Sequence, residues 1–382
     1  MKPLVSGAEA KRFLEPRTGT YLLFPYRVDA GRARLLPADE MAAEFPKAWK
    51  YLKGFEAELR AREGKKFGDD NWHRMGRTQN LDKQEVPKLM VPRLVARLGC
   101  FVDDQGHYYC DNVDVGGVVP NRVDDIWFLA GVLNAPVSST IFDWLSKPFR
   151  GDYKSANKQF IAPLPIPKGD RVSRAALSAL ARQLQESRTA QLDARARLDE
   201  RLAATARTVW PLEKLLPDVR DISAIEATTP KSVPASERKA WVDDARKGDE
   251  ESALARIGAG VRLDSMFDVV LADGKLAFRI DEQEAASVFV SDTESALVAA
   301  QWRCVALDFE PRGKDDGKRL IDRLRRVATS ADPALTAQIV ALGDDLTRLD
   351  TVIRDDEAQL HDLTCTMFDL SDAERALVAR GR

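Results

Sequence analysis

Residues 147–168 read Lys-Pro-Phe-Arg-Gly-Asp-Tyr-Lys-Ser-Ala-Asn-Lys-Gln-Phe-Ile-Ala-Pro-Leu-Pro-Ile-Pro-Lys. Lys and Arg recur through this stretch, Asp152 is its single acid, and aromatic and amide side chains stand between the cations. Such cations can neutralise phosphates, and Asn or Gln can pair with a base edge. We therefore predict a surface for a polyanion, whose candidate residues are Lys147, Arg150, Tyr153, Lys154, Asn157, Lys158 and Gln159.

Three prolines, Pro163, Pro165 and Pro167, end this stretch, because proline lacks a backbone donor and interrupts a helix. Short β-like runs and basic loops precede them, and long charged helices follow. We predict an α+β fold, with a mixed N-terminal α/β domain containing hairpins, then long antiparallel helices around a small α/β insertion. The predicted segments are a recognition domain (1–168), a spacer helix (169–216), a linker (217–235), the insertion (236–330), and a heptad helix with a C-terminal helix (331–382).

Length and composition indicate a globular protein of two or three domains, with 382 residues of which 44% are hydrophobic and 31% charged. The apolar runs are too short to span a bilayer, and the Met-Lys-Pro-Leu start lacks a signal-peptide core. We expect a cytoplasmic protein without a membrane partner. The four cysteines have no framework spacing, so we expect reduced thiols.

The charge is distributed unevenly along the chain. Residues 1–102 carry 20 Lys and Arg against 13 Asp and Glu, although the net charge of the whole chain is −2. A basic first quarter favours a localised anion-binding face. A solvated basic face explains the charge equally well.

A second polar stretch lies in the loop 64–84, which contains Trp72-His-Arg-Met-Gly-Arg-Thr-Gln79. Arg can bond guanine and Gln can bond adenine through paired hydrogen bonds, and long loops in compact domains are often functional. Arg74, Arg77 and Gln79 are therefore candidate DNA-binding residues, and Lys88 is a further one. Each residue alone could equally serve solubility or loop capping, but their concentration in two loops favours binding.

The N-terminal half shows a hairpin pattern over 20–36 and a helix beginning at Pro46, with Trp49, Leu52, Phe55 and Leu59 on one face. Further along, we predict strands over 86–95 and 100–102, helices over 124–134 and 137–145, and a hairpin over 267–280 around Asp273-Gly274.

The clearest periodicity lies in a predicted helix near 335–369. Its apolar positions recur at three- and four-residue steps, interrupted by Asp356. This seam must pack against a partner, and the helix predicted over 173–209 is the obvious antiparallel one. Ser371-Asp-Ala-Glu374 is a capping box that should start a short last helix. The seam residues are Ile339, Leu342, Leu346, Leu349, Ile353, Leu360, Leu363 and Met367.

Motifs for several chemistries are missing from the sequence. A methyltransferase needs a glycine-rich cofactor turn and an Asn or Asp followed by Pro-Pro-aromatic, but the nearest glycine pair, Asp114-Val-Gly-Gly117, lacks the third glycine. Asp273-Gly-Lys275 with Asp264 or Asp268 could suit a metal nuclease, but a hairpin turn explains it better. Zinc ligands could come from Cys100, His107, Cys110 and His73, at a spacing that matches no common zinc module. We predict no catalytic, cofactor-binding or metal-binding residue.

An ordered series of motifs resembles the TaqI-like specificity domain over roughly residues 1–168. This domain is the C-terminal target-recognition region of adenine-specific DNA methyltransferases and type IIG restriction–modification enzymes. The helices at 173–209 and 335–369 are similar to the helical spacers that flank such domains. The motifs are Leu4 to Gly7, Tyr21 to Tyr26, Phe45 to Leu52, Arg60 to Glu63, Trp72 to Asn80, Pro87 to Pro92, Tyr108 to Asn112, Leu129 to Asn134 and Tyr153 to Pro167.

The resemblance implies a module that recognises a specific double-stranded DNA sequence for restriction–modification or phage defence. In that family a methyltransferase domain precedes this region, so we expect a separate subunit, a truncated product or an excised piece. S-adenosylmethionine is then expected only in the catalytic domain or partner chain. Two alternatives stay open, a protein-interaction scaffold that uses the helical half and a metal-dependent nuclease.

Overall fold

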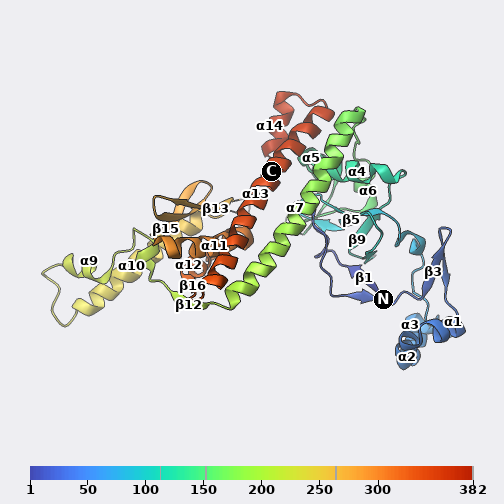
Figure 1. Cartoon of the computed structure of the whole chain (residues 1–382), viewed down its shortest axis with the longest axis horizontal. Helices are drawn as coiled ribbons and strands as arrows, with labels where there is room; N and C mark the ends of the chain where they lie inside the picture. Colours follow the sequence, from blue (N-terminus) through green and yellow to red (C-terminus); the bar gives the residue numbers. More distant parts are fainter. Residues whose placement is uncertain (112, 151–152, 263–264, 381–382) are drawn as a thin grey trace. The chain divides into compact units, whose positions relative to one another are not determined.

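The computed structural model describes residues 1–111, 113–150, 153–262 and 265–380, except for the side chains of Arg150, Asp292, Thr293, Ala379 and Arg380. The chain forms two compact units, unit 1 (Met1–Thr189 and Ile353–Arg382) and unit 2 (Ala190–Val352). Both boundaries fall inside long helices, α7 (Arg171–Ala203) and α13 (Pro333–Met367). Helices and several small sheets occur together, which confirms the predicted α+β fold (Figure 1).

Residues 26–65 of unit 1 form a hairpin followed by three short helices. The hairpin pairs β3 (Tyr26–Asp29) with β4 (Arg32–Leu35), and its turn residues Ala30 and Gly31 have positive φ, which confirms the prediction. The helices are α1 (Ala38–Glu44), α2 (Pro46–Gly54) and α3 (Glu56–Lys65). The single helix predicted from Pro46 breaks at Phe55, whose φ of −115° and ψ of 13° are not helical. Phe55, which was predicted to lie on the apolar face of that helix, is exposed.

Three small sheets form the middle of unit 1. In the first, β5 (Lys88–Pro92) lies between β7 (Phe101–Asp103) and β9 (Val115–Val118), with both pairs antiparallel. In the second, β11 (Tyr153–Ser155) lies between β10 (Pro148–Arg150) and β6 (Leu94–Val95). In the third, β1 (Lys2–Val5) lies between β2 (Tyr21–Leu22) and β8 (Tyr109–Cys110). The strand predicted over 86–95 is thus two strands that join different sheets, with Arg93 between them.

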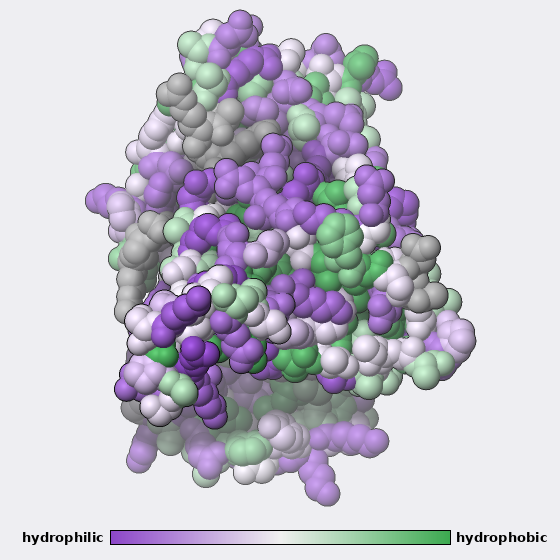
Figure 2. Space-filling model, turned by 90° about the vertical axis from the view of Figure 1, so that its left-hand side faces the viewer, coloured by the Kyte–Doolittle hydropathy of each residue, from purple (hydrophilic) through white to green (hydrophobic). Residues whose placement is uncertain are grey.

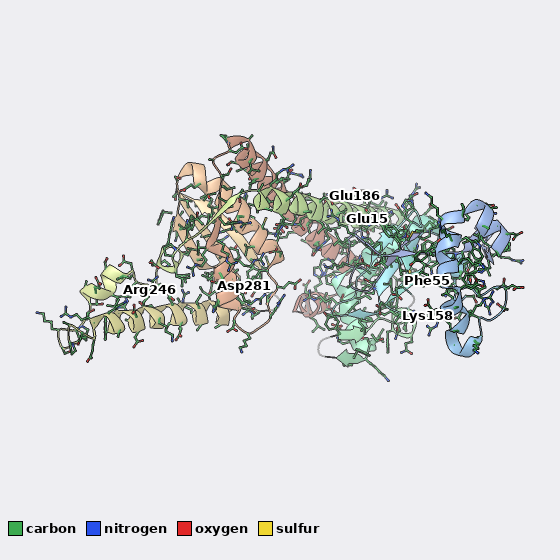
Figure 3. All side chains as sticks on the ribbon, turned by 90° about the horizontal axis from the view of Figure 1, so that it is seen from below. Glu15, Phe55, Lys158, Glu186, Arg246 and Asp281 are labelled. Carbon is green, nitrogen blue, oxygen red and sulfur yellow. The ribbon has the colours of Figure 1, made fainter. Side chains whose placement is uncertain are left out.

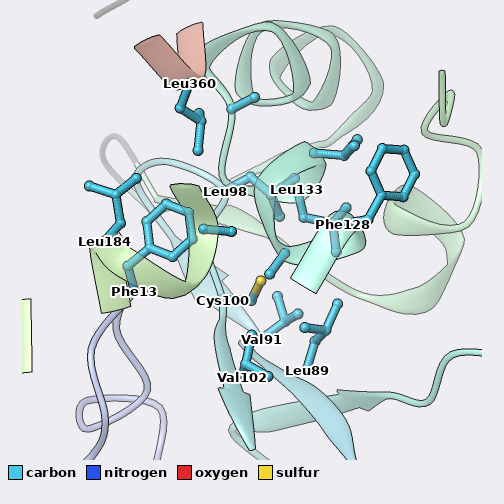
Figure 4. Packing of buried hydrophobic residues seen from close by; sticks show 14 of the residues in the cluster. Phe13, Leu89, Val91, Leu98, Cys100, Val102, Phe128, Leu133, Leu184 and Leu360 are labelled. Atoms are coloured by element: carbon cyan, nitrogen blue, oxygen red, sulfur yellow. The ribbon is translucent and has the colours of Figure 1, made fainter. Parts of the chain in front are cut away.

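Apolar helices cover the sheets and form the core of unit 1 (Figure 4). They are α4 (Ile126–Leu133) and α5 (Pro136–Leu145), preceded by the 3-10 turn η2 (Val123–Asp125), and both confirm predicted helices. The core joins Phe13 and Leu89 to Phe128 of α4, Leu184 of α7 and Leu360 of α13. The remaining helical pieces are η1 (Leu81–Lys83), α6 (Lys158–Ile161) and α14 (Asp372–Arg380).

Among the described residues, no single helix is long and apolar enough to cross a membrane. The bent pair Val123–Leu133 and Pro136–Leu145, with 75° between its halves, passes that test of length and composition together. Most residues of α4 are buried in the core of unit 1.

A partly buried ion network ties the N-terminal segment to both long helices within unit 1. The Glu357 carboxylate accepts from Arg12 at 2.5 Å and also from Arg188. Burial alone would raise the pKa of Glu357, but the two guanidinium groups hold it below its usual value. Arg12 also donates from Nε to the Asn134 carbonyl, so residues near the chain start are fixed to α4 as well.

The long helices pack along the predicted seam. In unit 1, Leu177 and Leu184 of α7 share a core with Ile353 and Leu360 of α13. In unit 2, Ala194, Leu198 and Leu202 of α7 meet Ile339, Leu346 and Leu349 of α13. The start of each helix therefore pairs with the end of the other, as predicted for antiparallel partners. The first helix ends earlier than predicted, because β12 (Ala206–Val209) pairs with β16 (Arg326–Thr329).

Unit 2 places helices around an antiparallel sheet, in the order β13 (Phe267–Ala272), β14 (Lys275–Ile280) and β15 (Gln283–Phe289). Asp273 and Gly274 form its first turn with positive φ, which confirms that hairpin. Its helices are α8 (Leu212–Leu215), α9 (Ile222–Ala227), α10 (Arg238–Gly260), α11 (Asp292–Asp308) and α12 (Asp316–Leu324). Figure 2 shows a face on which hydrophilic side chains surround smaller hydrophobic areas.

Candidate nucleic-acid interface

A hollow of about 830 Å³ in unit 1 brings parts of the two predicted loops together. Asn80, Lys83 and Gln84 come from the end of the first loop, and Asn157, Lys158 and Gln159 come from the second. No Asp or Glu occurs among the described residues that line it. The hollow therefore combines amide groups with cationic side chains and lacks carboxylates that would repel an anion. Its other lining residues are Lys88, Val91, Arg93, Cys110, Val115, Gly116, Gly117, Val118, Val119, Ala156, Ile161 and Ala162.

Backbone bonds hold the second loop in place at the hollow. The Ala156 N–H donates to the Arg93 carbonyl at 2.8 Å, and β11 pairs with β6 just before it. Asn157 then begins α6, where its carbonyl accepts from the Phe160 N–H at 2.9 Å and its Nδ2 donates to Ser155 Oγ at 2.6 Å. The side chains of Lys158 (Figure 3) and Gln159 are exposed and make no hydrogen bond or ion pair with a described residue. Both are thus available to a ligand.

The other candidates of the second loop lie outside the hollow. Lys154 forms an ion pair with Asp143 at 2.5 Å, which neutralises part of its charge. Lys147 and Tyr153 are exposed. The side chain of Arg150 lies outside the described part of the structure.

The first loop divides into a structural part and an exposed part. The Arg74 guanidinium binds Asp69 and the carbonyls of Asn71 and Lys66, and it lies 4.7 Å from the centre of the Phe67 ring. These contacts hold the loop, so Arg74 is largely committed to the protein itself.

Arg77 and Gln79 are exposed and make no polar contact with a described residue. Neither lines the hollow. Arg77 instead lines a smaller depression of about 240 Å³, which shares Gln84 and Cys110 with the hollow. Arg77 therefore lies beside the hollow, and the end of the loop at Asn80 reaches it.

Lys88 is not a surface residue, contrary to the prediction that it contacts DNA. Its side chain is 1% exposed, and its Nζ donates to Asp103 Oδ2 at 2.6 Å and to the Gln84 carbonyl at 2.8 Å. Asp103 also accepts from the backbone N–H groups of His107 and Tyr108. The ammonium cannot meet a phosphate while this pair is intact, so we remove Lys88 from the candidate interface.

The structure adds Arg93, which the sequence reasoning missed. Arg93 lies between β5 and β6, and its backbone N–H donates to the Asp114 carbonyl at 2.7 Å. Its side chain lines the hollow, and its buried Nε lacks a hydrogen-bond partner among the described residues. The sequence did contain a signal for Arg93, because it is a cation inside the apolar run 86–95. A buried cation normally needs a hydrogen-bonding or charged partner.

The alternative metal and nuclease sites are not assembled in the described residues. Burial raises the pKa of Cys100 to about 12 and that of Cys110 to about 11, so both thiols stay protonated at neutral pH. No group of three or more His, Cys, Asp or Glu side chains among the described residues is arranged to hold a metal ion. Asp268 pairs with Arg279 at 2.6 Å, and Asp264 lies outside the described residues.

Comparison with known proteins gives one distant likeness. No family model matches the sequence. Over 166 residues, or 41% of this chain, the sequence is 22% identical to an Escherichia coli protein described as "Type II restriction enzyme and methyltransferase RM.Eco57I". The chain spans 16% of the length of that protein. The chain is thus distantly similar to part of a restriction–modification protein.

Proposed function

We propose that this chain recognises a specific double-stranded DNA sequence for an adenine-specific methyltransferase of restriction–modification or phage defence. The observation that carries the proposal is the hollow in which amides and cations from both predicted loops meet, with no carboxylate among its described lining residues. The distant likeness to a restriction enzyme and methyltransferase supports the same class of function.

The available side chains divide into two roles. Lys158 is suited to phosphates, which fix the position of a protein on DNA without reading sequence. Lys83 also lines the hollow, but it pairs with Asp82 at 2.9 Å. Asn157 and Gln159 at the hollow, and Arg77 beside it, carry the groups that pair with adenine and guanine edges. Gln79, which is exposed, carries the same amide group. Both roles are needed for recognition of a sequence.

Binding to duplex DNA should weaken steeply as salt rises, because each neutralised phosphate releases counterions. We expect Lys158→Ala to weaken all duplexes alike, and Gln159→Ala to relax preference at one base pair by about 1–3 kcal/mol. Fluorescence titrations with a randomised duplex pool at two salt concentrations measure both effects.

The matched control is Lys318→Ala, which removes an exposed lysine of unit 2 and should leave affinity unchanged. Salt-independent binding, or no binding to any duplex, would refute the proposal.

We further propose that methylation is supplied by another domain or chain, which binds S-adenosylmethionine and carries the Asn-Pro-Pro-aromatic motif. An enzyme that modifies a base must flip it into its own pocket, so recognition and catalysis can be separate surfaces. Calorimetry should detect no S-adenosylmethionine binding by this chain alone, and co-purification from native lysate should recover a chain with the motif. Cofactor binding by the isolated chain would contradict this division of roles.

A further inference from the structure

Two consecutive glycines in β9, Gly116 and Gly117, are not required by the fold. Neither has positive φ. A Cβ atom at Gly116 would lie 3.8 Å from the Val91 carbonyl oxygen, and one at Gly117 would lie 3.5 Å from Cys110 Sγ, which are ordinary contacts. Glycine weakens a strand and often marks a place where a ligand or another backbone comes close. No described residue of the chain is close enough to require glycine at these two positions, which is what a site for an external ligand would show.

Two other glycines of unit 1 are required by the backbone conformation or by close packing. Gly106 has a φ of 68°, and a Cβ there would lie 2.5 Å from the Glu85 carbonyl. A Cβ at Gly131 would lie 2.7 Å from the Leu177 side chain. Packing explains both of these residues, whereas it does not explain Gly116 or Gly117.

The glycine pair and the cationic side chain of Arg93 line the same hollow. β9 is an edge strand, paired on one side with β5, so part of its backbone lacks a partner within the sheet. Arg93 lines the same hollow with a buried Nε that no described residue bonds. Backbone N–H groups and guanidinium groups both donate to phosphate oxygens.

We propose that the bare backbone of Gly116 and Gly117 and the Arg93 guanidinium together seat a phosphodiester group of the DNA backbone. This inference rests on the proposed function and adds the site where the sugar–phosphate chain comes closest to the protein. Successive residues of a strand direct their Cβ positions to opposite faces, so a methyl group at one of these two glycines would occupy space that the sugar–phosphate chain needs. Because these contacts involve no base edge, they position the duplex and do not select its sequence.

The test compares Gly116→Ala, Gly117→Ala and Arg93→Gln in the full chain. Thermal melting reports the fold, and fluorescence titration with several duplexes of different sequence reports binding. We expect both glycine variants to melt at or above the wild-type temperature, and at least one of them to bind every duplex about tenfold more weakly. Arg93→Gln should weaken all duplexes alike and reduce the slope of log affinity against log salt by about 1.

Two controls separate this site from general effects. Arg97→Gln removes an exposed arginine that does not line the hollow, so an equal effect would mean that only net charge matters. Gly248→Ala adds a methyl group in α10 of unit 2, where nothing lies within 4 Å, and should leave binding unchanged.

The remaining outcomes distinguish failure of the phosphodiester site from failure of the proposed recognition function. Glycine variants that bind DNA like the wild type, or that melt at much lower temperature, would overturn the proposed seat while the recognition function stands. A change of preference at one base pair in Arg93→Gln would show a base contact instead. A wild-type chain that binds no duplex would overturn both proposals.

Discussion

Lys88→Met should lower the free energy of unfolding by about 3–5 kcal/mol, the usual cost of removing one partner of a buried ion pair. The Lys88 and Asp103 side chains are 1% and 2% exposed. Without the ammonium, the Asp103 carboxylate keeps only its bonds to the His107 and Tyr108 N–H groups. A buried carboxylate without its counter-charge is strongly destabilising. Urea denaturation followed by circular dichroism measures the change.

Lys83→Met is the matched control, because Lys83 is half exposed and pairs at the surface with Asp82 at 2.9 Å. Its cost should stay within about 1 kcal/mol. Replacing both partners, Lys88→Met with Asp103→Leu, should recover much of the loss, since no charge is then left unpaired. Equal stability of Lys88→Met and wild type would mean that this ion pair is not buried in solution. Loss of DNA binding in a Lys88 variant therefore has to be interpreted together with its melting temperature.

Leu349→Asp should destabilise unit 2 by at least about 3 kcal/mol, since loss of a buried leucine alone costs about that much. Leu349 is buried in the seam with Leu198 and Leu346. The substitution also places a carboxylate among apolar side chains, which adds a desolvation penalty. Thermal and urea unfolding of the full chain measure the effect.

Arg348→Asp tests the same helix on its exposed side. The Arg348 side chain is 64% exposed and bonds Asp345 at 3.3 Å, so its loss should cost less than about 1 kcal/mol. Similar melting temperatures for the two variants would show that the seam is not packed as described.

Local patterns predicted those parts of the fold that depend on neighbouring residues. The Asp273-Gly274 turn, the seam of α13 and the capping box all follow from spacing within one segment. In the capping box, Ser371 donates from its backbone N–H to Glu374 Oε2 at 2.8 Å. By contrast, β12 pairs with β16, more than a hundred residues away, and no local signal indicated that helix 173–209 would end early to form it.

Only part of the candidate site could be predicted from the sequence. The residue types show which groups could bind DNA, but they do not show which side chains are buried or paired. Asn157, Lys158 and Gln159 line one hollow, as their clustering in the sequence suggested. Lys88 has the same charge as Lys158, but it is buried against Asp103, which is distant in sequence and adjacent in the sheet. Arg93 was overlooked because its neighbours in sequence are those of a buried strand, although its side chain lines the hollow.

The division of the chain into units has a consequence for biosynthesis. Unit 2 is one continuous stretch, whereas unit 1 is completed only by Ile353–Arg382. Ile353, Leu360 and Val378, which belong to the unit 1 core, leave the ribosome after the whole of unit 2. The apolar surfaces of α4, α5 and α7 that they cover stay open until unit 2 has been translated. The nascent chain therefore carries exposed hydrophobic surface of the kind that chaperones bind until α13 and α14 emerge.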